Sequence, residues 1–142
     1  MNRILSFAIF FLTSINILGR VSISTDFLKG TEWICMQLNV EIRKSEMSFT
    51  DSKVAIKLFF QSLGKTVEQT FPYYMCDEYP DSFDESKVGK GTSGRFLVRR
   101  TKNGFVCMEI VKITSTDLQM VRALGKGEEA IGGVEPVTYY RK

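Results

Sequence analysis

The stretch that decides the fold is residues 105–121, FVCMEIVKITSTDLQMV. Its first half alternates between two rows of side chains, Val106/Met108/Ile110 and Phe105/Cys107/Glu109. A two-residue period predicts a β-strand with one buried face. Residues 114–117, TSTD, then supply short polar side chains that bond to their own backbone and favour a turn. Because the alternation resumes at Leu118, the stretch predicts a β-hairpin.

The same pattern recurs on both sides of this hairpin. Further stretches alternate in the same way with turn residues between them, at residues 34–40, 53–60, 66–71, 95–100 and 137–141. Asn103-Gly104 is the strongest short hairpin signal in the chain. About eight short strands with little room for a helix predict an all-β fold, an antiparallel up-and-down barrel. A β-sandwich is the alternative.

The first residues have the layout of a secretory signal peptide. A short positive segment, Asn2-Arg3, precedes the apolar run of residues 4–12, and small residues follow at Ser22 and Ser24. The alternative, a membrane anchor over residues 4–18, is shorter than the ~20 apolar residues that a span needs. We therefore expect a signal peptide at 1–24, a β-barrel domain at 25–142, and a secreted or periplasmic protein with no membrane span after cleavage.

Composition excludes several classes of function. Without residues 1–24 the chain has 17 basic and 16 acidic residues, so its charge gives no argument for nucleic-acid binding. The chain has no histidine, which removes His-based catalytic triads and His metal sites. Its three cysteines have no close pairing that would indicate a zinc site. We expect no enzymatic activity, no cofactor and no metal.

The cysteines leave two alternatives open. An odd number in an exported protein allows one disulfide and one free thiol. Strand parity places Cys35 and Cys107 opposite the aliphatic faces of their strands, so a disulfide between them is one alternative. Three unpaired thiols are the other.

Two polar segments carry weak functional signals. Residues 89–94, GKGTSG, match the G-x-G-x-x-G pattern, but strand-like residues follow where a nucleotide site needs a helix. A flexible loop between strands explains these glycines. Residues 77–85 form an acidic loop, which is interpreted as solvated. A basic set either neutralises this loop or forms an anion-binding patch: Lys87, Lys90, Arg95, Arg99, Arg100 and Lys102.

With the strands placed, the domain resembles a small lipocalin-like (calycin-type) β-barrel. Three passages carry the resemblance: Leu28 to Trp33 (LKGTEW), Ile113 to Met120 (ITSTDLQM) and Tyr139 to Lys142 (YYRK). The resemblance implies an up-and-down barrel with an interior pocket for a small hydrophobic ligand. A solid core without a cavity is the alternative.

The inward rows of such a barrel would line the ligand. We expect the lining residues to be Val54, Ile56, Leu58, Phe60, Phe96, Val98, Val106, Met108, Ile110 and Tyr139. The alternative function is a protein-interaction or inhibitor module with a filled barrel. It would bind a protein partner through surface loops such as residues 77–85 and 125–133.

Overall fold

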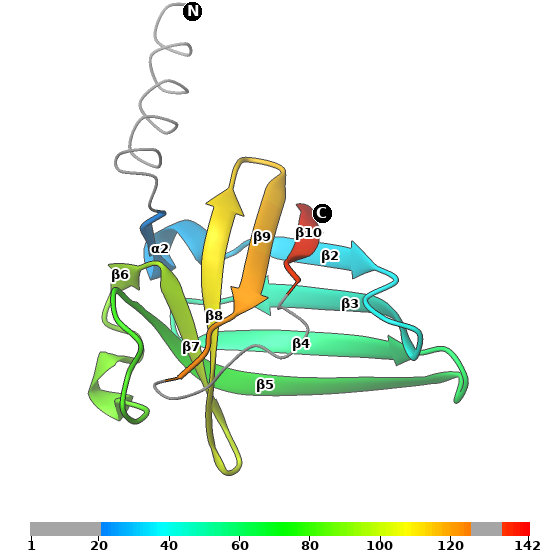
Figure 1. Cartoon of the computed structure of the whole chain (residues 1–142), viewed down its shortest axis with the longest axis horizontal. Helices are drawn as coiled ribbons and strands as arrows, with labels where there is room; N and C mark the ends of the chain where they lie inside the picture. The colour runs from blue at the N-terminus through cyan, green and yellow to red at the C-terminus, as the bar shows by residue number, and fades with distance from the viewer. Residues whose placement is uncertain (1–20, 126–134) are drawn as a thin grey trace, which may run out of the picture.

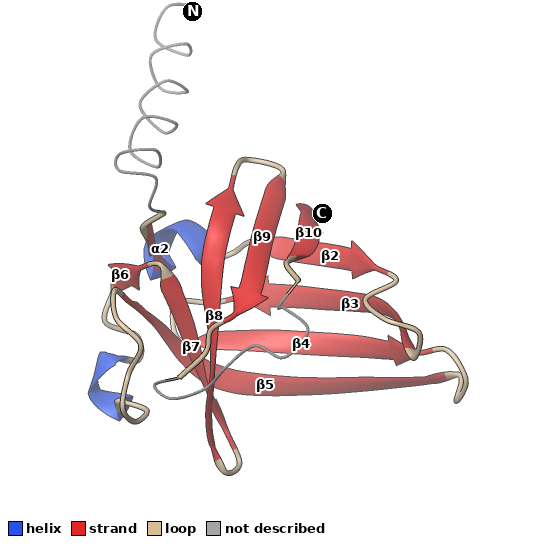
Figure 2. Cartoon of the chain, viewed as in Figure 1, coloured by secondary structure: helices blue, strands red, loops and turns tan. Residues whose placement is uncertain are grey.

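The computed structural model describes residues 21–125 and 135–142. Eight antiparallel strands form a closed barrel, and each strand pairs with its neighbours in chain order (Figures 1 and 2). The strands are β2 Glu32–Met36, β3 Ile42–Phe49, β4 Lys53–Phe60, β5 Lys65–Cys76, β7 Phe96–Thr101, β8 Gly104–Ile113, β9 Asp117–Arg122 and β10 Val137–Arg141. The last strand, β10, pairs with both β9 and β2 and so closes the barrel. The predicted up-and-down barrel is confirmed, and the sandwich alternative is excluded.

The central hairpin folds as predicted. It consists of β8 and β9, and the turn between them is held by Thr114 and Asp117. The Thr114 amide donates to the Asp117 carbonyl at 2.8 Å, and the Thr114 hydroxyl accepts from the Asp117 amide at 2.9 Å. Short polar side chains therefore close this turn in the way the sequence indicates.

Short elements cover one end of the barrel. They are β1 Ile23–Ser24, the helical turn α2 Thr25–Leu28, β6 Ser93–Gly94 and the 3₁₀ helix η2 Glu85–Lys87. β1 pairs with β6, and the Ser24 hydroxyl accepts a hydrogen bond from the Phe27 amide at the start of α2. Val21 and Ile23, which the expected signal peptide 1–24 includes, are buried in the core. The rest of that segment, residues 1–20, lies outside the described residues.

The buried side chains form two separate clusters. The inner cluster lies inside the barrel and includes Trp33, Cys35, Met47, Phe49, Val54, Tyr73, Leu97, Ile110, Leu118 and Tyr139. The outer cluster consists of Tyr74, Cys76, Phe96, Val98, Cys107 and Ala123. Successive side chains of a strand point to opposite faces of a sheet, so β5, β7 and β8 contribute to both clusters. The wall of the barrel is therefore buried on both faces at this point.

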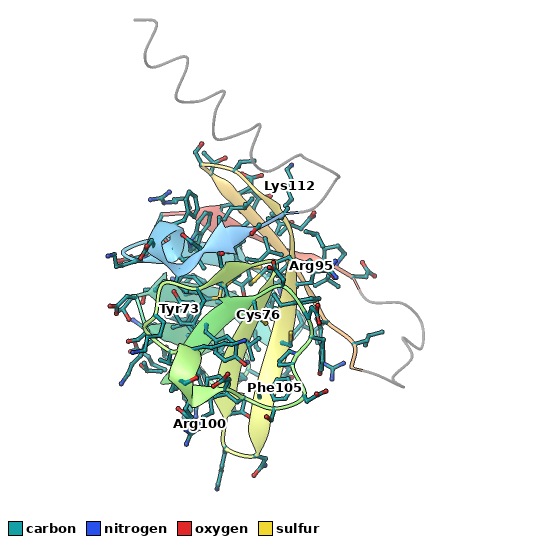
Figure 3. All side chains as sticks on the ribbon, turned by 90° about the vertical axis from the view of Figure 1, so that its left-hand side faces the viewer. Tyr73, Cys76, Arg95, Arg100, Phe105 and Lys112 are labelled. Atoms are coloured by element: carbon teal, nitrogen blue, oxygen red, sulfur yellow. The ribbon has the colours of Figure 1, made fainter. Side chains whose placement is uncertain are left out.

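The loop between β5 and β6 covers the outer cluster. Tyr79, Phe83 and Val88 from this loop pack against it. The Tyr74 hydroxyl accepts from the Asp84 amide at 3.2 Å, and the Arg100 guanidinium pairs with the Glu85 carboxylate. Figure 3 faces this side of the molecule, with Cys76 near its centre. The acidic loop that the sequence indicates as solvated therefore also has a structural role.

Candidate functional site

One end of the barrel interior is filled. Trp33 at the start of β2 is fully buried, and its indole nitrogen donates to the Thr31 hydroxyl at 2.8 Å. The Arg141 guanidinium from β10 lies 5.6 Å from the Trp33 ring centroid. Leu28 of α2 is also fully buried against this end. These contacts close the barrel at the end where β2 begins, and we call this end the base.

Away from the base, the inward-facing side chains are less buried. Along β4 the inward row begins with Val54, which is 1% exposed, and continues with Ile56, Leu58 and Phe60, which are half-buried. Leu58 pairs with Ser45 of β3 on one side and Val67 of β5 on the other. Apolar side chains that face inward yet keep accessible surface show that the inner face is open to solvent towards the β4–β5 turn.

The ladder between β5 and β7 is short on this side. β5 pairs with β4 from Lys65 to Pro72, but it pairs with β7 only from Tyr73 to Cys76. The β4–β5 hairpin and the β7–β8 hairpin consequently point away from each other (Figure 1). Among the strands that the structure describes, residues 65–71 therefore have no partner on this edge, and the barrel wall is interrupted beside it.

Polar groups lie on the inner face next to this interruption. Ser45 is fully buried, and its hydroxyl shares a hydrogen bond of 3.3 Å with the Tyr139 hydroxyl. Burial raises the pKa of Tyr139, so its hydroxyl keeps its proton at neutral pH. Arg99 of β7 is opposite Tyr73 in the ladder, and its guanidinium lies 4.5 Å from the Phe71 ring centroid. The inner face thus combines apolar side chains with hydrogen-bond donors.

Eight of the ten residues expected to line a ligand lie on the inner side of the wall. Val54, Ile110 and Tyr139 belong to the inner cluster, and Ile56 and Met108 pack against it. Leu58, Phe60 and Val106 share the inward rows with these residues. All eight are therefore brought together by the fold.

Phe96 and Val98 are the exceptions. Both belong to the outer cluster, so they face away from the barrel interior and cannot line a ligand there. The inward residues of β7 are instead Leu97 and Arg99. The expectation for these two residues is corrected because β7 is apolar on both faces, and alternation alone does not show which face is inside.

Of the two alternatives for the cysteines, the structure favours three unpaired thiols over a Cys35–Cys107 disulfide. Cys35 belongs to the inner cluster and Cys107 to the outer cluster, so the two thiols lie on opposite sides of the wall. All three cysteines are free and buried. Burial raises the pKa of Cys107 to about 12 and raises the pKa of Cys35 and Cys76 as well. Such thiols are poor nucleophiles, because the thiolate is the reactive form.

The expected basic patch is divided among different surroundings. Arg95 pairs with Glu109 at 3.1 Å, and Arg100 pairs with Glu85 on the loop that covers the outer cluster. Arg99 alone of the three faces the interior. Arg99 follows Leu97 by two residues and so lies on the same face of β7. This spacing was the signal in the sequence, but using it required knowing which face of β7 is inside.

Comparisons with family models, curated proteins and solved structures find no match to this chain. Within residues 21–125 and 135–142, no group of three or more Cys, Asp or Glu side chains is placed to hold a metal ion. The same residues include no helix of the length and apolar character that crossing a membrane requires. The class that the structure defines is therefore an eight-stranded antiparallel closed β-barrel, compatible with a lipocalin-like fold.

Proposed function

We propose that this protein is a non-enzymatic, lipocalin-like (calycin-type) binding module that holds a small apolar ligand in its barrel. The observation that carries the proposal is the gradient of burial along the inward row of β4, from fully buried Val54 to half-buried Phe60. Ligand sites in proteins are concave and mostly apolar, with a few polar groups that fix orientation. Leu58, Val67 and Phe71 supply the apolar part, and the Ser45–Tyr139 pair supplies polar groups.

Titration with an uncharged apolar dye, N-phenyl-1-naphthylamine, tests this proposal. We expect the dye to bind with increased fluorescence, because it moves from water into an apolar environment. The variant Leu58→Glu should weaken binding about tenfold or more, because it places a carboxylate on the inward row. The matched control is Thr70→Glu, at an exposed position that pairs with Ala55 on the outer face. This control should bind the dye as the wild type does.

Both variants need far-ultraviolet circular dichroism and a thermal melt beside the titration, so that loss of folding is separated from loss of binding. Equal loss of dye binding in folded Leu58→Glu and Thr70→Glu would place the dye on the outer surface and contradict the proposal. A wild-type protein that binds no dye would contradict it as well.

Export is part of the proposal. The layout of residues 1–24 supports a signal peptide, and the protein would then act outside the cytoplasm. Val21 and Ile23 pack in the inner cluster, which favours a cleavage point before Val21 over one near Thr25. Mass spectrometry of the exported protein tests both points, because retention of residues 21–24 changes the mass.

A protein-interaction module is the second candidate, and the unpaired edge of β5 favours it. Within the described residues, the backbone of residues 65–71 pairs only with β4, and most of these residues are exposed. An extended segment of a partner can add to such an edge as a further strand. Of the two loops expected for this function, residues 77–85 cover the outer cluster, and the loop 125–133 lies outside the described residues except for Gly125. Absence of dye binding in the wild type would favour this candidate.

A further inference from the structure

The carboxylates of the barrel strands all lie on the outer face. They are Glu32, Glu46, Glu68, Glu109 and Asp117. Each alternates with inward residues: Glu46, for example, lies between Ser45 and Met47, which are both buried. Lys142 lies 3.5 Å from both Glu32 and Glu46 on the outside. No barrel strand in the described part of the chain therefore places an acidic side chain on its inner face.

Arg99 places a positive charge on that inner face. It follows Leu97 of the inner cluster by two residues, and it pairs in the ladder with Tyr73 and Val106. Its guanidinium stacks on Phe71, with the central carbon 4.5 Å from the ring centroid. Among the described residues its guanidinium has no hydrogen bond and no carboxylate partner, whereas the guanidinium groups of Arg95 and Arg100 each pair with a carboxylate.

This charge is partly removed from water. Burial lowers the pKa of Arg99, which means that its surroundings disfavour the charged form. Burying this charge costs free energy. The contact with Phe71 offsets only part of that cost, because a cation over an aromatic ring is a weak interaction compared with a buried ion pair. An inward arginine without a counter-charge therefore leaves the site electrostatically incomplete.

A second donor lies on the same inner face as Arg99. Tyr139 of β10 belongs to the inner cluster, and Arg99 of β7 faces the same interior. The Tyr139 hydroxyl also bonds to Ser45. An acidic group placed between Arg99 and Tyr139 would accept hydrogen bonds from both, and its apolar part would lie along Leu58 and Phe71.

We propose that the ligand of this barrel is an apolar molecule that carries one acidic group, and that the Arg99 guanidinium binds this group inside the barrel with the Tyr139 hydroxyl as a second donor. This inference rests on the proposed function, because it names the class of ligand for the same interior. It assigns to Arg99 a binding role that the alternation of apolar residues does not indicate.

Displacement of N-phenyl-1-naphthylamine by dodecanoate and by dodecanol tests the inference, since these probes share a chain and differ in charge. The wild type should bind dodecanoate about tenfold or more tightly than dodecanol, because a charge-assisted hydrogen bond is stronger than a neutral one. Arg99→Gln should reduce dodecanoate affinity to about that of dodecanol and reduce dodecanol affinity much less, because a neutral hydroxyl gains less from the guanidinium than a carboxylate does. Arg99→Lys should keep part of the preference, because it keeps the charge and loses the planar fork.

The matched control is Arg100→Gln, on the outer face beside Glu85, which should keep the full preference for dodecanoate. Equal affinities of the wild type for the acid and the alcohol would overturn the inference and leave the proposed function standing. A preference for dodecanoate that survives in folded Arg99→Gln would also overturn it. If neither probe displaces the dye and the dye itself does not bind, the proposed function fails and the inference fails with it.

Discussion

Gly94 shows how one residue fixes the position of the loop that covers the outer cluster. Its φ is +153°, and a Cβ at this position would lie 2.1 Å from the carbonyl carbon and oxygen of Cys76. A side chain would thus collide with the backbone of β5, which cannot give way cheaply. We predict that Gly94→Ala lowers the free energy of unfolding by about 3 kcal/mol or more, measured by urea denaturation.

Gly104→Ala is the matched control for this prediction. Gly104 has almost the same φ, +155°, but a Cβ there would have no neighbour within 4 Å. Its substitution should cost only the backbone strain, about 1–3 kcal/mol. Equal losses in the two variants would show that the close approach to Cys76 is unimportant. The glycine pattern of residues 89–94 is therefore explained by backbone geometry.

At the scale of elements, the sequence predicted the strands that are apolar on one face and was ambiguous for the others. The β8–β9 hairpin was predicted because its inward row and its polar turn agree. β3 was not predicted as a full strand, because its inner row of Ser45, Met47 and Phe49 has only two large apolar members and its outer row is polar.

The inner face of β2 and β7 could not be chosen from the sequence. β2 presents Ile34 and Met36 to the outside and Trp33 and Cys35 to the inside, the reverse of what its aliphatic row indicates. β7 is apolar on both faces because the loop between β5 and β6 covers its outer face. The errors in the candidate site, Phe96 and Val98, follow from β7, and the choice between a Cys35–Cys107 disulfide and free thiols depended on both strands.

The two faces of β7 give an experimental test of this assignment. Val98→Ala and Leu97→Ala both remove buried methyl groups, so each should lower the free energy of unfolding, by about 2 kcal/mol for Val98→Ala. Only Leu97→Ala should change the affinity for N-phenyl-1-naphthylamine, because only Leu97 faces the interior. A change in dye affinity for Val98→Ala as large as that for Leu97→Ala would contradict the placement of Val98 outside the barrel.

At the scale of the whole molecule, burial of weak acids links stability to alkaline pH. Six side chains have a raised pKa with burial as the largest cause: Cys35, Cys76, Cys107, Tyr73, Tyr74 and Tyr139. They belong to both clusters, so the effect depends on the fold as a whole. The chain has no histidine, and so it lacks the side chain that ordinarily titrates near neutral pH.

The direction of the pH dependence follows from Cys107. The pKa of this thiol rises from the ordinary 9.0 to about 12 in the folded protein. Between these values the unfolded chain loses the proton and the folded chain keeps it, so unfolding is favoured as pH rises. Its stabilising effect is fully present below pH 9.0 and is lost up to about pH 12. For this one group the free energy of unfolding should fall by about 1.4 kcal/mol per pH unit.

Urea denaturation in a reducing buffer at several pH values above 9.0 measures this slope. For Cys107→Ala the free energy of unfolding should fall less steeply with pH, by the contribution of about one proton, because its unfolded state no longer ionises at this position. Val98→Ala, which removes a non-ionising neighbour from the same cluster, should be less stable at every pH and keep the slope of the wild type. If Cys107→Ala gives a curve parallel to that of the wild type, then Cys107 ionises equally in the folded and unfolded chains, and the loop between β5 and β6 does not keep water from the outer cluster.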